Sequence, residues 1–280
     1  MLRLIQSNHM PILAQLFCEQ GKQSADPFIP TTVVVQSFGI GQWLKLQLAE
    51  QQGISANLDC ILPANYIWRL YHQLLPDIRL PEDSPFDRDR LSWRLMRLIP
   101  NSQHESLLRY LDAPGDPDIR QFQLSFQIAQ LFDQYLVYRP DWPTAWEQGN
   151  PLLNAESLGN QGWQVALWQE IIKDDPGIAS LHRAKLHQQL LDAISDKPTL
   201  PSDLPEKLTI FGLSTLAQMQ LDTFHALSEI VDIDVYFLNP CRHYWGDIVA
   251  SRDAAKRSVR HLLDTEDALS DEDYLTVGNP

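Results

Sequence analysis

The chain has 280 residues, 44% of them hydrophobic, and a formal net charge of −14. This composition supports a large folded core and excludes a disordered chain. No apolar run approaches the roughly 18 residues of a membrane-spanning helix, and the acidity argues against nucleic-acid binding through a broad basic surface.

The first elements predict the start of a parallel sheet. A short strand at Leu2–Ile5 precedes a helix from about Met10 to Gly21, which Ser7 and Asn8 can cap. Thr31–Val35 is β-branched and apolar on both faces, as a buried parallel strand requires. A glycine-bearing turn at Gln36–Gly41 and a helix that Gly53 can stop complete half of a βαβ unit.

The carboxyl end of this strand is where an open α/β sheet binds its ligands. It carries Gln36, Ser37, Phe38 and Gln42. Three of these side chains form hydrogen bonds and one is aromatic, but none is a titratable catalyst. The segment therefore indicates binding, not catalysis.

The next segments separate sheet from helix. Ile54–Leu62 is extended, and a helix follows from about Tyr66 to Leu75. After a proline-rich connector, helical patterns succeed one another without a strand: Asp89–Leu98, Ser102–Leu111, Ile119–Arg139, Leu152–Lys173 and Ser180–Ile194. Four tryptophans in the later part are expected to pack between these helices: Trp142, Trp146, Trp163 and Trp168.

Sequence patterns typical of strands return after the linker Lys197–Glu206. Leu208–Phe211 and Ile233–Leu238 read as strands, with a helix at Ala217–Ser228 between them. The predicted fold is therefore an α/β domain with a parallel sheet and an all-helical insertion. The expected boundaries are 1–85 and 201–280 for the two parts of the α/β domain and 86–200 for the insertion. The weakly patterned segment Ser251–Pro280 suggests that the chain is part of a longer one.

Motifs of known chemistry are missing from the sequence. There is no Gly-x-x-x-x-Gly-Lys-[Ser/Thr] loop, and Gly39-Ile40-Gly41 is too short for a dinucleotide fingerprint. His182 and His187 are spaced poorly for a metal pair, and Gly212-Leu213-Ser214 lacks the flanks of a nucleophile elbow. Asp232 and Asp234 are expected at a strand entrance or a sheet edge. The three cysteines are scattered, which argues against a disulfide, a zinc site or an iron–sulfur site.

One polar face remains on the long helix. Gln130, Asp133, Gln134 and Val137 have the i, i+3, i+4, i+7 spacing of neighbours on a helix surface. Amides, a carboxylate and a nearby arginine, with the aromatic side chain of the first turn, suit the reading of exposed bases. From periodicity alone, an ordinary solvated face is the favoured interpretation.

Several stretches resemble the RecC family, the gamma chain of exodeoxyribonuclease V. The most specific is Leu131-Phe132-Asp133-Gln134-Tyr135-Leu136-Val137-Tyr138-Arg139-Pro140-Asp141-Trp142. Others, in family order, are Val35-Gln36-Ser37 with Gln42-Trp43-Leu44, Leu62-Pro63-Ala64 with Ile67-Trp68, His182-Arg183-Ala184, and Asn239-Pro240-Cys241-Arg242.

The resemblance implies a superfamily-one helicase-like fold that has lost its ATP site. Ser7-Asn8-His9-Met10 stands where a motor has its phosphate loop, and Ile210-Phe211-Gly212-Leu213 stands where it has the acids that hold Mg²⁺. The chain is therefore expected to be inactive by itself and to need no cofactor, while ATP and Mg²⁺ are used by partner subunits. The absence of a signal peptide and the family role imply a cytoplasmic protein.

The resemblance also implies a role in recombinational repair of double-strand breaks. The family joins RecB and RecD in a heterotrimer, binds duplex-end DNA and the 3′-ended single strand, and recognises the Chi hotspot. Phe38 and Gln130 depart from the threonine and the acid familiar in the family, which implies a changed or less strict hotspot. The alternative is an assembly module that contacts partner subunits without reading bases. The implied Chi positions are Gln36, Phe38, Gln42, Leu62, Trp68, Gln130, Leu131, Asp133, Gln134, Arg139 and Arg183.

Overall fold

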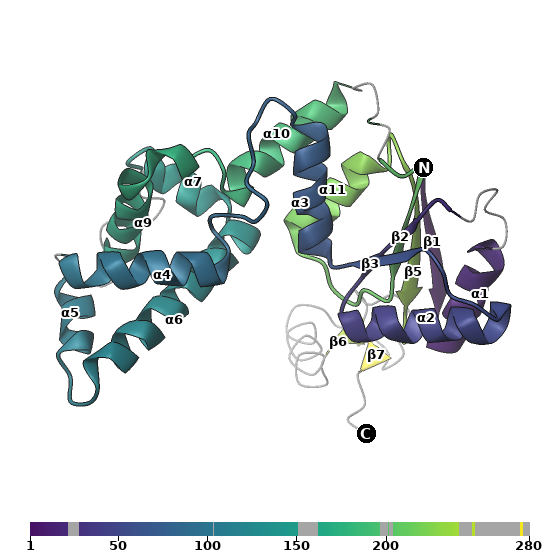
Figure 1. The fold of residues 1–280 in the computed structure, drawn as a ribbon, viewed down its shortest axis with the longest axis horizontal. Helices are drawn as coiled ribbons and strands as arrows, with labels where there is room; N and C mark the ends of the chain where they lie inside the picture. Colours follow the sequence, from purple (N-terminus) through teal and green to yellow (C-terminus); the bar gives the residue numbers. More distant parts are fainter. Residues whose placement is uncertain are drawn as a thin grey trace, which may run out of the picture.

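A five-stranded sheet and the helices around it form the fold (Figure 1). The computed structural model describes residues 1–21, 28–102, 104–150, 162–196, 201, 204–240, 248–249 and 275–276. The strands of the main sheet are β1 (Leu2–Ser7), β2 (Thr31–Val35), β3 (Leu58–Ile61), β4 (Lys207–Phe211) and β5 (Asp232–Leu238). A separate pair of short parallel strands is formed by β6 (Ile248–Val249) and β7 (Leu275–Thr276).

Ten α-helices lie within the described residues. They are α1 (Met10–Gly21), α2 (Phe38–Gln52), α3 (Pro63–Leu74), α4 (Arg88–Leu98), α5 (Glu105–Leu111), α6 (Pro117–Tyr138), α7 (Asp141–Glu147), α9 (Gly162–Asp174), α10 (Arg183–Ser195) and α11 (Gln218–Leu227). Short 3₁₀ turns occur at η1 (Ile99–Asn101) and η3 (Pro176–Ile178).

The main sheet is parallel throughout, in the order β1-β5-β4-β2-β3. This confirms the predicted α/β class with a parallel sheet. The inner strand β2 is buried on both sides, because Val33 and Val35 face one core while Val34 faces the other. Successive side chains of a strand point to opposite faces, and both faces of β2 are buried. This explains why the strand ends in three consecutive valines, Val33–Val35.

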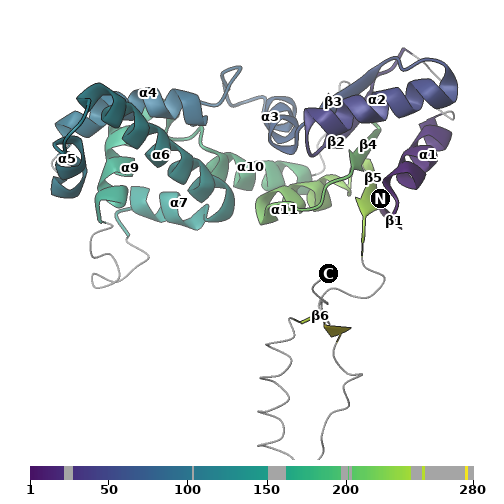
Figure 2. The same ribbon diagram turned by 90° about the horizontal axis from the view of Figure 1, so that it is seen from below.

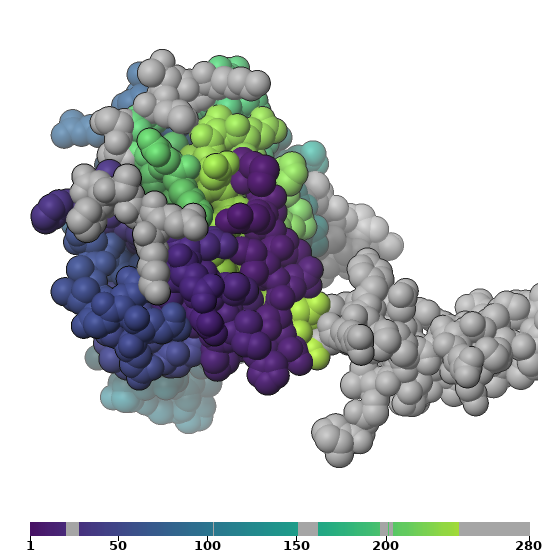
Figure 3. Space-filling view, turned by 90° about the vertical axis from the view of Figure 1, so that its right-hand side faces the viewer, coloured from purple at the N-terminus to yellow at the C-terminus, as the bar shows by residue number. Residues whose placement is uncertain are grey.

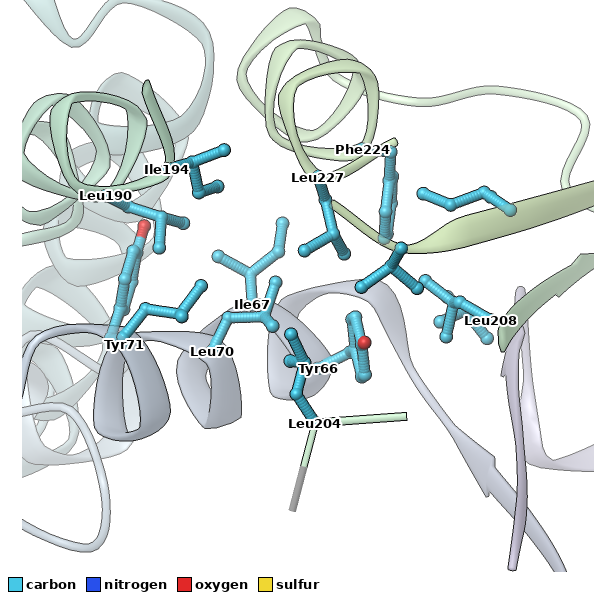
Figure 4. Close-up of a cluster of buried hydrophobic side chains, with 14 of the residues drawn as sticks. Tyr66, Ile67, Leu70, Tyr71, Leu190, Ile194, Leu204, Leu208, Phe224 and Leu227 are labelled. Atoms are coloured by element: carbon cyan, nitrogen blue, oxygen red, sulfur yellow. The ribbon is translucent and has the colours of Figure 1, made fainter. Parts of the chain in front are cut away.

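Helices cover both faces of the sheet. On one face, α1 and α2 pack Leu13, Phe17 and Leu44 against the strands; the space-filling view of this end of the molecule shows the purple N-terminal segment beside the light-green residues near β5 (Figure 3). On the other face, α3, α10 and α11 share a core. Figure 4 shows Leu70 of α3, Leu190 of α10 and Leu227 of α11 pointing toward one another.

The remaining helices enclose a core of their own. Phe132 of α6 lies against Trp168 of α9, and Phe86 stacks on the same indole. Trp146 is buried here, and Trp142 and Trp163 pack against the cluster, which confirms the predicted role of these tryptophans. Figure 2 shows α4, α5, α6, α7 and α9 gathered on one side and the sheet on the other, with α10 between them.

The helix α10 belongs by its packing to the sheet side. Leu186, Leu190 and Ile194 lie in the core shared with α3 and α11, although the chain enters α10 from the helical side. The helix α6 contacts both α10 and α11. The division into domains at residues 85 and 200 stays a prediction.

Two local expectations differ from the structure. The turn predicted over Gln36–Gly41 is shorter, because Ser37 caps a helix that already begins at Phe38. Asp234 is not at a strand entrance or sheet edge; it lies 4% exposed on the inner strand β5, where Arg3 and Lys207 neutralise it. The helix expected over Leu152–Lys173 agrees with α9 where the structure describes it, and its predicted start lies outside the described residues. Residues 151–161, 241–247 and most of 251–280 are outside the described part.

Candidate nucleic-acid interface

The predicted binding turn lies where the strand order reverses. From β2 the chain passes through α2 to β3 at one edge, whereas from β4 it passes through α11 to β5 in the opposite direction. Adjacent strands β2 and β4 therefore mark the topological switch point, where open α/β sheets leave a crevice at the strand carboxyl ends. There the side-chain amide of Gln36 donates a hydrogen bond of 3.1 Å to Ser214 Oγ.

The first turn of α2 presents its side chains to solvent beside this point. Ser37 Oγ accepts from the backbone N–H of Ile40 at 3.3 Å, which fixes the start of the helix. Phe38 is 66% exposed, and Gln42 one turn later is exposed as well. An exposed phenyl ring between two amides offers a stacking surface and hydrogen bonds without any titratable group.

Gly41 sets how closely α2 approaches the sheet. A Cβ at this position would lie 2.9 Å from Cys60 Cβ and 3.2 Å from Cys60 Sγ on β3. Only the absence of a side chain permits this packing. The position of Gln42 relative to the sheet therefore depends on its glycine neighbour.

The next candidates lie on α3, which follows strand β3. Leu62 is half-buried at the N-cap position, and Pro63 starts the helix without losing a hydrogen bond. Trp68 is half-buried, its indole N–H donates to the Glu82 carbonyl at 2.9 Å, and its ring packs edge-on against Tyr71. The indole is thus held in one orientation.

The polar face predicted on α6 lies outside its core. Phe132 and Leu136 are buried, whereas Gln130 and Gln134 are exposed and Leu131 is half-buried. The spacing therefore identified the correct outer face. The geometry by itself is equally that of a solvated helix surface.

Two acids hold Arg183 at the junction of the two parts. Its guanidinium donates to Asp133 Oδ1 at 2.9 Å and to Asp87 Oδ1 at 3.0 Å. Asp87 occupies the N-cap position of α4 but makes no cap bond, because its carboxylate faces the arginine. Burial raises the pKa of Asp87, and the charge of Arg183 opposes that rise.

Trp68 and Arg183 meet at one small cavity. Val137 of α6 and Met219 of α11 also line it, and its volume is about 30 Å³, enough to hold water. Trp68 of α3 lies 69 residues before Val137 of α6 and still farther before Arg183 of α10. Only the tertiary fold therefore brings Trp68 to the other two.

Arg139 follows the last residue of α6, and its hydrogen-bond donors are paired with a nearby residue. Its guanidinium donates to Asp141 at 3.2 and 3.0 Å and lies 4.4 Å above the Trp142 ring. The hydrogen bonds from Arg139 lower the pKa of Asp141. This side chain is therefore oriented toward its own helix end.

The structure thus brings the candidates together in two groups. The first group, Gln36, Phe38 and Gln42, lies at the switch point. The second group, Trp68, Asp133 and Arg183, lies around the junction of α3, α6 and α10. Leu62 begins the helix that leads from one to the other, and Gln130, Leu131, Gln134 and Arg139 extend the second group along α6.

Two hydrogen-bond partners of the candidate residues, Ser214 and Asp87, were not predicted from the sequence. Ser214 could have been placed beside Gln36, since the carboxyl ends of neighbouring parallel strands meet at one edge of the sheet. Asp87 carried no comparable signal, because it lies 96 residues from Arg183 and reads locally as a helix cap. In the described part of the chain, no group of three or more acidic, histidine or cysteine side chains could hold a metal ion. No helix there is long and apolar enough to cross a membrane.

Comparisons with known proteins agree with the sequence resemblance. A family described as "RecC, N-terminal domain" matches residues 2–276. The protein "RecBCD enzyme subunit RecC" of Haemophilus influenzae is 40% identical over 293 residues, covering 95% of this chain and 26% of the relative. The protein of the same name from Escherichia coli K12 is 38% identical over 275 residues, covering 94% and 24%. The chain therefore spans about a quarter of the length of these relatives.

Proposed function

The chain belongs to the RecC family, and from that we propose that it is the non-catalytic, DNA-binding scaffold part of a RecBCD-type enzyme in recombinational double-strand-break repair. In this role it contacts RecB and RecD in a heterotrimer, binds the 3′-ended strand from a duplex end, and recognises the Chi hotspot. The relatives are named as subunits of the RecBCD enzyme, which supports the partners.

The observation that carries the proposal is the first turn of α2 at the switch point. Phe38 and Gln42 are exposed beside Gln36, in the place where an α/β sheet binds its ligand. Single-stranded bases are read by stacking on rings and by hydrogen bonds to their edges. Neither activity requires an ionisable catalyst.

The residues at the carboxyl end of the edge strand β1 do not fit a bound nucleoside triphosphate. The segment between β1 and α1 has no glycine and no lysine, and the Met10 methyl lies 3.2 Å from where a Cβ on Gly212 would be. A phosphate-binding loop instead needs close backbone N–H groups and a lysine. We therefore assign ATP and Mg²⁺ to the partner subunits.

The helicase-like architecture with a helical insertion is part of the same proposal. It is supported by the separate aromatic core of α4, α6, α7 and α9, which is distinct from the two cores on the sheet. The insertion returns to the sheet through α10, whose Arg183 holds Asp133 of α6. Such a joint would keep the α6 face in a fixed position relative to α3.

The test uses a full-length subunit that carries this sequence, assembled with its partners. Gln42→Ala and Asp133→Ala should each weaken the hotspot response, measured as the yield of strands terminated at the hotspot. Unwinding of hotspot-free duplex should proceed at the parent rate. A parent-like hotspot response in both variants would refute base reading by these two groups.

A second function, an assembly module without base reading, is favoured by one observation. Asp133, Arg183 and Arg139 are already engaged within the fold, so they can serve structure alone. Under that reading, Asp133→Ala lowers recovery of the heterotrimer and leaves the hotspot response of the recovered enzyme unchanged.

A further inference from the structure

A line of three aromatic rings, two exposed and one half-buried, lies between α4 and α6. Trp93 of α4 is 65% exposed and its ring centroid lies 6.2 Å from that of Phe122, which is 43% exposed. Phe126, one turn further along α6, stacks beside Phe122 at 6.1 Å. Adjoining exposed aromatic rings of this kind offer a surface on which a flat ligand can stack.

This line continues the α6 face proposed to read bases. Phe122 and Phe126 are four residues apart, and Gln130 follows at the same interval, so the three share one side of the helix. Asp133 lies 11 residues beyond Phe122, a rise of about 16 Å along the axis. One extended strand can therefore pass along both surfaces.

Contacts also connect the two surfaces across α4. The Arg88 guanidinium lies 4.8 Å above the Phe126 ring. The preceding residue, Asp87, accepts from Arg183, which in turn donates to Asp133. The aromatic line is thus linked to the Asp133–Arg183 pair; Figure 1 shows α4 and α6 side by side.

Partly exposed arginines of α4 supply groups that can contact a phosphate backbone. The helix α4 carries four arginines and one acid. Arg94 is turned inward to Asp174 and Asp175. The other three arginines pair with Asp89, Asp83 and Asp174, but they keep half or more of their side chains exposed: Arg88, Arg90 and Arg97. Arginines beside exposed aromatic rings are the combination that proteins use to hold single strands without sequence preference.

We propose that the α4–α6 seam, defined by Arg88, Trp93, Phe122 and Phe126, is a stacking site for single-stranded DNA. It holds one or more bases on the exposed rings and neighbouring phosphates with the arginines of α4, whatever the sequence. The site rests on the proposed function for the identity of the strand. It binds a part of the same strand that lies before or after the bases that are read.

The experiment uses the assembled enzyme with a full-length subunit and a tailed duplex that lacks the hotspot. The tail carries 4-thiothymidine, and crosslinks are mapped to the peptide of residues 88–98. The parent enzyme should crosslink there. The double variant Trp93→Leu with Phe122→Leu keeps the apolar bulk but loses the rings, and it should lower affinity for the tail by about fivefold or more, because stacking contributes about 1 kcal/mol or more per base.

Two controls keep the outcome decisive. Trp93→Phe retains a ring and should bind nearly as the parent does, whereas Phe28→Ala removes an exposed ring outside the seam and should have no effect. Parent-like affinity of the double variant, together with no crosslink at 88–98, overturns the site. Loss of partner subunits from the double variant also overturns it, in favour of a protein interface.

The seam and base reading can fail separately. If Gln42→Ala and Asp133→Ala leave the hotspot response intact while the double variant loses affinity, the seam stands and base reading falls. If the two single variants lose the hotspot response while the double variant binds the tail as the parent does, base reading stands and the seam falls.

Discussion

The packing of α2 on β3 gives a stability prediction that the structure makes quantitative. Alanine at position 41 would place a methyl carbon 2.9 Å from Cys60 Cβ. Carbon atoms prefer about 3.5–4.0 Å, so α2 has to move by about 1 Å or the strand has to yield. Overpacking of this kind costs about 1–3 kcal/mol.

Gly39 is the matched control in the same turn of helix. A Cβ there meets nothing closer than Ser37 Oγ at 3.6 Å. Both substitutions gain roughly 0.5–1 kcal/mol from replacing glycine in a helix, so this contribution cancels between them. We expect Gly39→Ala to be slightly stabilising and Gly41→Ala to be less stable than Gly39→Ala by about 1–3 kcal/mol.

Urea unfolding of the two variants, followed by circular dichroism, measures this difference. The Gly41→Ala variant should also lose hotspot response in the assembled enzyme, because Gln42 moves with the helix. Equal free energies of unfolding for the two variants would refute the packing argument. Equal stability with unequal hotspot response would place the role of Gly41 in the site alone.

Four further outcomes are expected. Arg183→Met should destabilise the chain by about 1–3 kcal/mol in urea unfolding, since both acids lose a charged partner; no change would show that the joint is not held by this residue. Burial disfavours the charged form of Asp234, but Arg3 and Lys207 outweigh it and lower its pKa. The unfolded chain therefore binds the proton more readily, so this contribution to stability is present above about pH 4 and falls below it; Asp234→Asn should remove that part of the acid dependence, and an unchanged pH profile would contradict the assignment. The 280-residue chain alone, with a net charge of −14, should bind single strands weakly at physiological salt in an anisotropy titration, and tight binding would show that the assembled enzyme is not needed. Titration with ATP and Mg²⁺ should give no saturable binding to the chain, and a clear Mg²⁺-dependent isotherm would contradict the loss of the nucleotide site.

The sequence revealed elements whose signal is local. Thr31–Val35 predicted a strand buried on both faces, and Gly53 predicted the end of α2; its φ of 81° and its N–H bond to Ala49 confirm the stop. The outer face of α6 was likewise evident from spacing. In each case the pattern spans a few residues and depends on the period of one element.

Features that depend on distant segments could not be predicted in this way. Asp87 pairs with an arginine that lies 96 residues away, so no local pattern indicated the contact. Asp234 was expected at a strand entrance or a sheet edge, because its partners Arg3 and Lys207 come from two other strands and leave no local signal. The helix start at Phe38 was missed since two glycines suggested a turn. The turn glycine Gly41 is instead a packing residue, which only the register of α2 on β3 reveals.

The central claim is that the first turn of α2 touches the bases of the 3′-ended strand. Phe38 can be replaced by the photoreactive analogue p-benzoylphenylalanine, which preserves an exposed aromatic ring at the same place. Irradiation of the assembled enzyme halted at a hotspot should attach the subunit to hotspot nucleotides of that strand. Attachment to a partner subunit, with no attachment to DNA, would contradict the proposed function.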